Sequence, residues 1–405
     1  MRNPVLSFAI AVFLTCWANF TLADEVLFSS IGQRLQLMKA VAHYKFERRL
    51  PIEDLARETI VIEQAVNQGR RQGLKPETTA RFFRAQIQAA KQIQNYWFEQ
   101  WQMQPPVLPA PRLIDTRAAL LRLGDRIVAN LNQAIAPTSL PQFLEATQVE
   151  GLSASRQSKL FTALSDLAFY PDYTTQIQDQ GVVRIGITLD YAPFSYGTLE
   201  QPLGIDVELG QKIANSLGVD VAWIQTSWPK LTEDFIRGRF DLAMGGVSIT
   251  PLRLQAGFFS EPYHVGGKTP IGRCADQRRF TDVASIDQPQ VRIIVNPGGT
   301  NAKFARAHIA QAEILSFPDN RFIFEEIRAN RADVMFTDAI EVSLQTLRHP
   351  DLCALMPGRH LTHQEKAIWM PQDRALKANI DRLITQLHQR DEMTTLFRRW
   401  LKPRP

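Results

Sequence analysis

The chain has 405 residues, 45% of them hydrophobic and 21% charged, and a formal net charge of +5 at pH 7. A chain of this length can build two or three ordinary hydrophobic cores, and neither low complexity nor a block of like charge indicates extended disorder. Because 46 lysine and arginine residues are spread among 41 aspartate and glutamate residues, the surface is only mildly basic. This charge balance argues against a nucleic-acid-binding protein.

The amino terminus has the order of regions found in a secretory signal. Arg2 precedes an apolar stretch from Val5 to Trp17, and Thr21-Leu22-Ala23 stands just before Asp24. A membrane helix is the competing interpretation, but the apolar stretch has about 13 residues and a span needs about 20. We therefore expect residues 1–23 to be a cleaved signal peptide, and the mature protein to be periplasmic with no membrane segment.

Cysteine usage agrees with export. Cys16 lies in the expected signal peptide, which leaves Cys274 and Cys353 as a pair. An oxidising compartment would allow them to form a disulfide, which closes a loop of about 80 residues and contributes about 4 kcal/mol in the chain-entropy model. Two separate buried thiols are the alternative.

Residues 24–171 have the periodicity of an all-α domain. Apolar residues recur at spacings of three and four, which is typical of helices with one buried face. The pattern predicts three long helices followed by two short ones: from Leu27 to before Pro51 (with Leu27, Ile31, Leu35, Met38 and Ala42 buried), from Pro76 past Trp101, and from Pro111 to about residue 134.

Several polar side chains lie on these apolar faces, where a charge must be paired or must hold a ligand. Arg34 and Lys45 are eleven residues apart, so they project from one helix face about 16 Å apart and could clamp a small dianion. Gln94 lies in the second helix's apolar seam, and Arg126 is on the third helix. Cations that extend their charged ends to solvent are the alternative interpretation.

The residues Gln33-Arg-Leu35, Lys45, Leu50-Pro-Ile-Glu-Asp54, Arg57, Gln86-Ile87 and Gln94 resemble the secreted, all-helical chorismate mutases over residues 24–171. The resemblance implies that the substrate carboxylates and ether oxygen are held by Arg34, Arg57, Lys45 and Arg126, with Asp54 orienting Arg57 and Gln94 as a second donor to the ether oxygen. Such a rearrangement needs only a cage that fixes the reactive conformer and stabilises developing charge.

Two positions depart from that family. Some secreted members carry glutamate in place of Gln94, and a glutamate must be protonated to donate, so the mutase step here should depend less on pH. Ala90 stands where a relative has a hydroxyl residue, which removes one polar contact to the substrate. A helical dimerisation module with buried ion pairs remains the structural alternative.

After an expected linker at residues 172–180, strands alternate with helix-length segments, which favours an α/β sheet with ligand groups on the loops after strands. The expected strands are Val182–Thr188, Val221–Gln225, Leu242–Met244, Arg292–Val295 and Val334–Phe336. We expect residues 181–405 to form two lobes, the first from about 181 to 273 and again from 360 to 403, with a ligand cleft at the crossover.

The run Ser248-Ile-Thr-Pro-Leu-Arg253 resembles the amino-acid class of periplasmic solute-binding proteins, in which an arginine here binds a ligand carboxylate. Thr250 can cap a helix that begins at Pro251, and Arg253 one turn later can bind a carboxylate with two hydrogen bonds. A surface arginine is the alternative. The turn Gly298-Gly-Thr300 offers free backbone N–H groups to an anion.

A closer match spans nearly the whole segment: Asp190-Tyr-Ala-Pro-Phe-Ser195, Thr226-Ser-Trp-Pro229, Gly267-Lys-Thr-Pro-Ile271, Asn296–Asn301 and Thr337–Glu341 resemble cyclohexadienyl dehydratase. The resemblance implies Glu341 as the general acid for the departing ring hydroxyl. It also implies Lys268 and Arg253 as carboxylate partners, Trp228 as a ring wall, and Asp190, Asn296, Thr300 and Asp338 as lining groups. Asp338 could instead pair with a ligand amine.

Glu341 falls near the start of an expected helix, where the helix dipole favours the ionised form, whereas an acid catalyst must keep its proton. Burial would have to outweigh the dipole. A helix-start acid with a structural role is the alternative.

Together these features predict an exported, bifunctional enzyme of two domains that converts chorismate to prephenate, and prephenate to phenylpyruvate or arogenate to phenylalanine. No cofactor or metal is expected, because the seven histidines show no ligand spacing and no phosphate-binding or dinucleotide fingerprint occurs. The oligomeric state is left open. The alternative is a periplasmic amino-acid-binding protein fused to a helical sensor or docking module, which would bind its ligand without consuming it.

Overall fold

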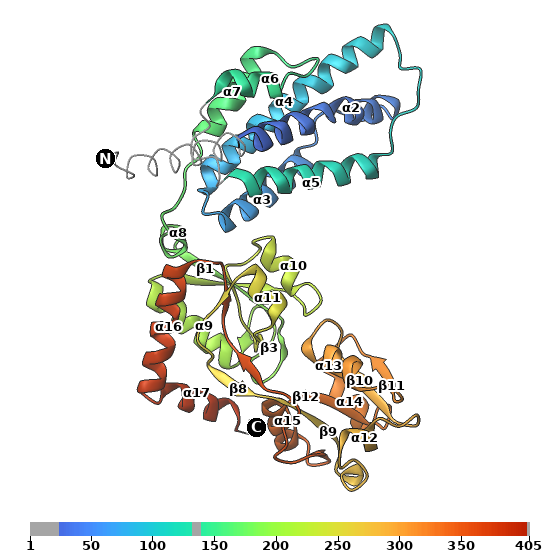
Figure 1. Ribbon diagram of the computed structural model, residues 1–405, viewed down its shortest axis with the longest axis vertical. Coiled ribbons are helices and arrows are strands. Elements are labelled where there is room, and N and C mark those ends of the chain that lie inside the picture. Colours follow the sequence, from blue (N-terminus) through green and yellow to red (C-terminus); the bar gives the residue numbers. More distant parts are fainter. Residues whose placement is uncertain (1–23, 132–138, 403–405) are drawn as a thin grey trace, which may run out of the picture. The chain divides into compact units, whose positions relative to one another are not determined.

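The computed structural model describes residues 24–131 and 139–402 (Figure 1). The chain divides into two compact units, with the boundary between Pro171 and Asp172. The expected signal peptide and the expected end of the third helix near residue 134 lie outside the described residues. None of the described helices combines the length and the apolar character needed to cross a membrane.

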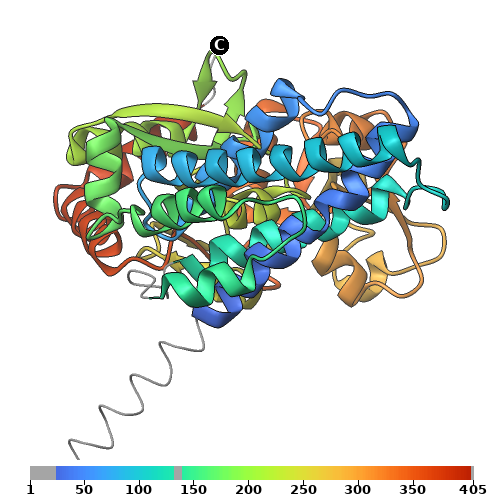
Figure 2. The same cartoon turned by 90° about the horizontal axis from the view of Figure 1, so that it is seen from above.

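The first unit is built from helices. Residues 24–36 are helical, and after one turn residue, Leu37, the chain continues as helix α2. The helices that follow residues 24–36 in this unit are α2 (Met38–Glu47), α3 (Leu55–Arg71), α4 (Pro76–Met103), α5 (Leu113–Leu131), α6 (Leu140–Ala146) and α7 (Ala154–Ser165). The long α4 packs against α2, α3 and α7, and Figure 2 shows it extended across the unit.

The helical periodicity located the core of this unit correctly. Leu27, Ile31, Leu35, Met38 and Ala42 are all buried, which confirms the predicted stripe. Helix α3 was not predicted, because its outward-facing residues Leu55 and Ile60 are apolar and exposed while only Ala65 and Gly69 of the helix are buried. Its apolar pattern therefore gives little sign of a buried face.

The second unit contains strands and helices in alternation. The elements up to the middle of the unit are α8 (Tyr173–Gln180), β1 (Val182–Ile187), β2 (Asp190–Tyr191), β3 (Ser195–Gly197), β4 (Pro202–Leu203), α9 (Ile205–Leu217), β5 (Asp220–Gln225), α10 (Leu231–Ile236), β6 (Leu242–Ala243), α11 (Pro251–Ala256), β7 (Phe258–Phe259) and β8 (His264–Gly266). The remaining elements are β9 (Lys268–Arg273), a 3-10 turn at Cys274–Asp276, α12 (Val283–Ile286), β10 (Arg292–Val295), α13 (Thr300–His308), β11 (Glu313–Ser316), α14 (Ile323–Arg328), β12 (Val334–Asp338), α15 (Ala339–Arg348), β13 (Leu352–Ala354), β14 (Gln364–Lys366), β15 (Trp369–Met370), α16 (Arg374–Gln389) and α17 (Glu392–Trp400).

The segment expected as a linker, residues 172–180, is instead a helix of this unit. Asp172 caps α8 by accepting a hydrogen bond from the backbone N–H of Thr175 at 2.7 Å. Tyr173 and Ile177 belong to the buried core around β1 and α9. The linker prediction was wrong because a polar stretch was interpreted as solvated, although two of its apolar side chains lie one helical turn apart.

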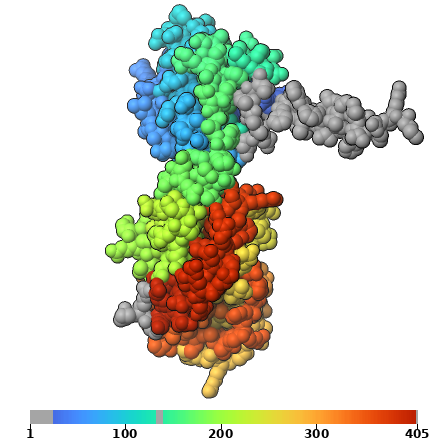
Figure 3. Space-filling model, turned by 90° about the vertical axis from the view of Figure 1, so that its left-hand side faces the viewer, coloured from blue at the N-terminus to red at the C-terminus, as the bar shows by residue number. Residues whose placement is uncertain are grey.

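Two five-stranded sheets define the lobes, with strand orders β5-β1-β6-β15-β7 and β11-β10-β12-β9-β13. Strands β8 and β14 pair antiparallel between them, and they carry the chain into the second lobe and back. The first lobe therefore ends before Lys268 and not at residue 273, since β9 pairs with β12 and β13 of the second lobe. Figure 3 shows α16 and α17 in red on one face of the first lobe.

The second lobe carries a disulfide between Cys274 and Cys353, whose Cα atoms are 4.8 Å apart. It joins the end of β9 to β13, two strands that are already paired in the sheet. The bridge therefore fixes the outer edge of this sheet, away from the hinge strands.

Candidate active sites

The helical unit encloses a cavity of about 530 Å³. The first helix and helices α2 to α5 supply its walls. Of the residues predicted for this site, five line it: Arg34, Lys45, Asp54, Arg57 and Gln94. Five more charged residues that were not predicted line the cavity: Glu53, Glu58, Lys91, Arg117 and Asp125.

Arg34 and Gln94 present unpaired polar atoms inside the protein. Nη1 of Arg34 donates to Oε1 of Gln86 at 3.2 Å, whereas its Nε is buried without a partner among the described residues. Nε2 of Gln94 donates to the carbonyl of Ala90 at 3.2 Å, and its Oε1 is likewise unpaired within the described part of the chain. Burial lowers the pKa of Arg34 to about 10. Buried polar atoms normally have partners, so these two groups are suited to bind a ligand.

The opposite wall is organised around the start of α3. Asp54 caps this helix by accepting a hydrogen bond from the backbone N–H of Arg57 at 3.0 Å. Nζ of Lys45 donates to the carbonyl of Ile52 at 2.6 Å, and desolvation lowers the pKa of its ammonium group. Asp54 thus positions Arg57 through the backbone of α3.

Arg126 does not belong to this site, and its prediction is corrected here. Arg117 and Arg126 are both exposed, but Arg117 lines the cavity together with Leu120, Leu121 and Gly124 of α5, and Arg126 does not. Positions 117 and 126 are nine residues apart, and at about 100° per residue they point to opposite sides of the helix. Arg117 is therefore the arginine of α5 that lies at the cavity wall, and the helical phase relative to Leu120 and Gly124 could have identified it.

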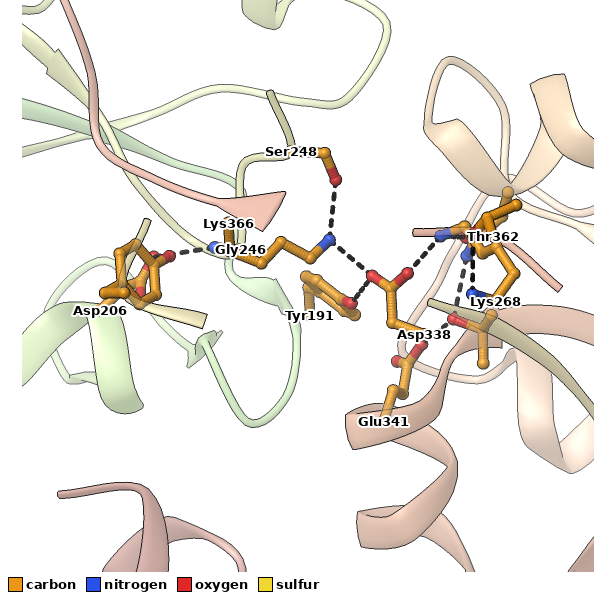
Figure 4. A network of polar contacts seen from close by, with 12 residues as sticks. Tyr191, Asp206, Gly246, Ser248, Lys268, Asp338, Glu341, Thr362 and Lys366 are labelled. Atoms are coloured by element: carbon orange, nitrogen blue, oxygen red, sulfur yellow. Dashed lines mark hydrogen bonds and ion pairs between the residues drawn. The ribbon is translucent and has the colours of Figure 1, made fainter. Parts of the chain in front are cut away.

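Figure 4 shows the polar network of the α/β unit, with Asp338 between the two lobes. Nζ of Lys268 lies 2.6 Å from Oδ1 of Asp338, Nζ of Lys366 lies 2.6 Å from Oδ2, and the hydroxyl of Tyr191 donates to the same Oδ2. Burial opposes ionisation, but the charges of Lys366 and Lys268 hold the pKa of Asp338 well below its usual range. Because Tyr191 and Lys366 come from the first lobe, these bonds also join the lobes.

Around this network lies a cleft with only about 20 Å³ of free space. Among the predicted residues, Trp228, Arg253, Asn296, Thr300 and Asp338 line it. Four others surround it without lining it. Thr250 caps α11, Asp190 accepts a hydrogen bond from Nε1 of Trp228 at 3.0 Å, Lys268 pairs with Asp338, and Glu341 is drawn below Asp338 in Figure 4.

Arg253 is buried at the end of the motif that predicted it. Thr250 accepts a hydrogen bond from its backbone N–H at 3.4 Å, and Nη1 donates to the carbonyl of Ser248 at 2.8 Å. Burial lowers the pKa of the guanidinium group to about 10. The arginine is therefore held inside the cleft wall, and the alternative of a solvated surface arginine is wrong.

Glu341 occupies the first turn of α15 and is only 2% exposed. Burial raises the pKa of its carboxyl to about 8, although a hydrogen bond from Thr337 to Oε2 at 2.5 Å and the charge of Lys268 act in the opposite direction. The negative charge of Asp338 adds to the increase. Burial thus outweighs the position at the helix start, and the carboxyl is mostly protonated at neutral pH.

Besides two glycines, five residues that line the cleft were not predicted as site residues: Tyr191, Ser248, Asn301, Asn320 and Lys366. Lys366 donates to Ser248 Oγ at 2.9 Å as well as to Asp338. It lies on β14, which carries the chain back into the first lobe, so its position depends on a strand pairing that no local motif marks. Tyr191 and Ser248 lie in the same sequence motifs as Asp190 and Arg253, but neither was predicted to contribute to the site.

No group of three or more histidine, cysteine, aspartate or glutamate side chains is placed to hold a metal ion in residues 24–131 and 139–402. The ionisable side chains that converge in the cleft are paired with one another or with hydroxyl and amide groups.

The two units define a helical bundle around a cationic cavity and a two-lobed α/β fold with a polar cleft. Residues 183–403 match family 3 of the bacterial extracellular solute-binding proteins, and residues 21–95 match type II chorismate mutase. The chain belongs to both families, which it joins in one polypeptide, and the first of them is a family of exported proteins.

Individual relatives agree with this assignment. A cyclohexadienyl dehydratase of Pseudomonas aeruginosa is 45% identical over 230 residues, covering 56% of this chain and 86% of the relative. A monofunctional chorismate mutase of Enterobacter agglomerans is 31% identical over 145 residues, covering 34% of this chain and 80% of the relative. The crystal structure of an ancestral amino acid-binding protein, a precursor of cyclohexadienyl dehydratase, superposes with a TM-score of 0.53 at 26% identity, covering 57% and 100% of the two chains.

Proposed function

We propose that the protein is a periplasmic, bifunctional enzyme. The helical unit rearranges chorismate to prephenate, and the α/β unit converts prephenate to phenylpyruvate or arogenate to phenylalanine. The observation that carries the proposal is Glu341, a buried carboxyl beside the cleft, whose pKa is raised by burial to about 8. A transport protein that only binds its ligand has no need of a neutral acid at that place.

The mutase step needs no nucleophile. The substrate's two carboxylates would be held by Arg34, Arg57 and Arg117 in the cavity, which fixes the ring and the side chain in the reactive conformer. Lys45 and the amide of Gln94 would donate to the ether oxygen, where negative charge develops as the C–O bond breaks. Each of these side chains lies on the cavity wall already.

The dehydratase step needs one proton. Glu341 would donate it to the ring hydroxyl, the C–O bond would break, and water would leave. Loss of the ring carboxylate as carbon dioxide supplies the electron pair that makes the ring aromatic. Arg253 would hold the carboxylate of the side chain, and Trp228 would cover the ring. Because the cleft has little free space in this closed form, the lobes must separate at β8 and β14 before substrate can enter.

Incubation of the purified protein with chorismate tests both activities and their pH dependence together. At pH 7 we expect phenylpyruvate to form without added cofactor. As the pH rises through about 8, Glu341 loses its proton, so dehydration should slow and prephenate should accumulate. The mutase rate should change much less over the same range, because Gln94 does not titrate.

Two results would contradict this proposal. Stoichiometric binding of chorismate and prephenate with no product would favour a binding protein fused to a helical module. Conversion whose dehydration step speeds up above pH 8 would show that Glu341 is not the acid.

A pair of variants on α5 tests the corrected cavity wall. We expect Arg117→Ala to lower the mutase kcat/KM by about a hundredfold, because one charged hydrogen bond to a substrate carboxylate is lost. Arg126→Ala removes the same side chain from the opposite side of the same helix, away from the cavity, and should leave the rate unchanged. Equal rates for the two variants would remove Arg117 from the site.

A further inference from the structure

A series of buried hydrogen bonds leads from Lys268 to Glu341. The ammonium group of Lys268 donates to Oδ1 of Asn301, Nδ2 of Asn301 donates to Oγ1 of Thr337 at 3.1 Å, and this hydroxyl donates to Oε2 of Glu341 at 2.5 Å. The four side chains are between 0% and 8% exposed. They come from β9, α13, β12 and α15, so four separate elements meet here.

The directions of the first two bonds in this series are fixed by Lys268. An ammonium group can only donate, so it must meet the oxygen of the Asn301 amide, and the amide nitrogen then faces Thr337 as a donor. The Thr337 oxygen accepts that bond with one of its two lone pairs and keeps a proton of its own to donate. When this proton is donated to Oε2 of Glu341, Oε2 is an acceptor and does not carry the acidic proton.

We infer that Thr337 determines which oxygen of Glu341 is the acid: Oε2 is held as a hydrogen-bond acceptor, and the proton consumed in dehydration sits on Oε1. Thr337 is a positioning residue, and Asn301 and Lys268 fix its direction. The inference rests on the proposed function, because it assigns an atom to the acid that the proposal names.

The surroundings of Glu341 favour this arrangement. Asp338 and Asp190 place negative charge near the carboxyl, Lys268 places positive charge, and the neutral Tyr191 hydroxyl is also close. Among the described residues, Thr337 is the hydrogen-bond donor to the carboxyl. One donor satisfies one oxygen, so ionisation would leave Oε1 charged beside Asp338 without a partner, and protonation of Oε1 removes that cost.

The reaction balances around this atom. The proton on Oε1 passes to the ring hydroxyl, the C–O bond breaks and water leaves, while the bond to the ring carboxylate breaks and releases carbon dioxide. Glu341 is left as a carboxylate whose Oε2 still accepts from Thr337. Opening of the lobes exposes Oε1 to water, from which it regains a proton.

The test compares Thr337→Val, which keeps the volume and removes the hydroxyl, with Thr337→Ser, which keeps the hydroxyl. With prephenate as substrate we expect the valine variant to lose about tenfold in kcat with little change in KM. Its pH profile should lose activity about one unit higher than the wild type, because the Thr337 bond lowers the pKa of Glu341. The serine variant should match the wild type, and the mutase activity of each chain reports the amount of intact protein.

A second measurement needs no change at Thr337. The infrared difference between the wild type and Glu341→Gln at pH 6 isolates the protonated carboxyl, and its carbonyl stretch should lie at the position of a carbonyl that accepts a hydrogen bond. A stretch at the free position, or a valine variant with the kcat and pH profile of the serine variant, overturns the inference. If Glu341→Gln itself turns over prephenate at the wild-type rate, the proposed role of Glu341 fails instead.

Discussion

Replacement of Glu341 by glutamine should abolish dehydration and leave the mutase intact. Glutamine has the shape of the protonated acid and can accept the hydrogen bond from Thr337, but it has no acidic proton to give. We expect kcat for prephenate to fall by a factor of about a thousand, within the range that a positioned general acid contributes. Chorismate supplied to this variant should be converted to prephenate, which then accumulates.

The stability of the protein should change little in this variant. Since burial keeps Glu341 neutral below about pH 8, the neutral glutamine introduces no new buried charge or unpaired group at pH 7. Thermal melting would check this. Glu313→Gln, at an exposed glutamate of the same lobe, is the matched control and should retain full activity. Full overall conversion by Glu341→Gln would mean that another group supplies the proton.

The closed cleft explains why this acid stays protonated. Lys268 and Lys366 lie within 2.6 Å of Asp338 and are largely neutralised by it. Asp338 offsets most of the positive charge of these two lysines, so they lower the pKa of Glu341 less than they would alone. A fold that places an ionised aspartate between two lysines at the end of β12 can thus keep a glutamic acid neutral in the first turn of α15, three residues further along the chain.

The parts of this protein that the sequence predicts are those that local chemistry specifies. The stripe from Leu27 to Ala42 follows from helical periodicity alone, and the cap formed by Thr250 before Pro251 follows from side-chain geometry. Both confirmed features depend on residues within about four helical turns of each other. The fold class of each unit, which depends on the same local patterns, is also confirmed.

The parts that the sequence does not predict depend on contacts between distant segments. Lys366 reaches Asp338 because β14 returns across the hinge, and Tyr191 reaches the same carboxylate from 147 positions away. The choice of Arg126 over Arg117 failed for a different reason. Both arginines lie on one predicted helix, and only the phase of α5 against its packing partners decides which of them faces the cavity.

Replacement of Arg34 by alanine should have the reverse effect of Glu341→Gln. Nη1 of Arg34 donates to Gln86, its Nε has no partner among the described residues, and the side chain lines the cavity. Its loss should lower the mutase kcat/KM by about a thousandfold, because both orientation of the substrate and compensation of its charge are removed. Prephenate supplied directly should still be dehydrated at the wild-type rate.

The stability of the Arg34 variant depends on whether the buried guanidinium group is compensated by the substrate or by the protein itself. Arg34 adopts its buried position at a cost, which its lowered pKa of about 10 records. If that cost is offset by the substrate carboxylate, Arg34→Ala should melt at the wild-type temperature or above it while it loses activity, and added guanidinium ion should restore part of the rate. A variant that melts well below the wild type and is not rescued by guanidinium would show that Arg34 stabilises the bundle through Gln86 and does not bind the substrate.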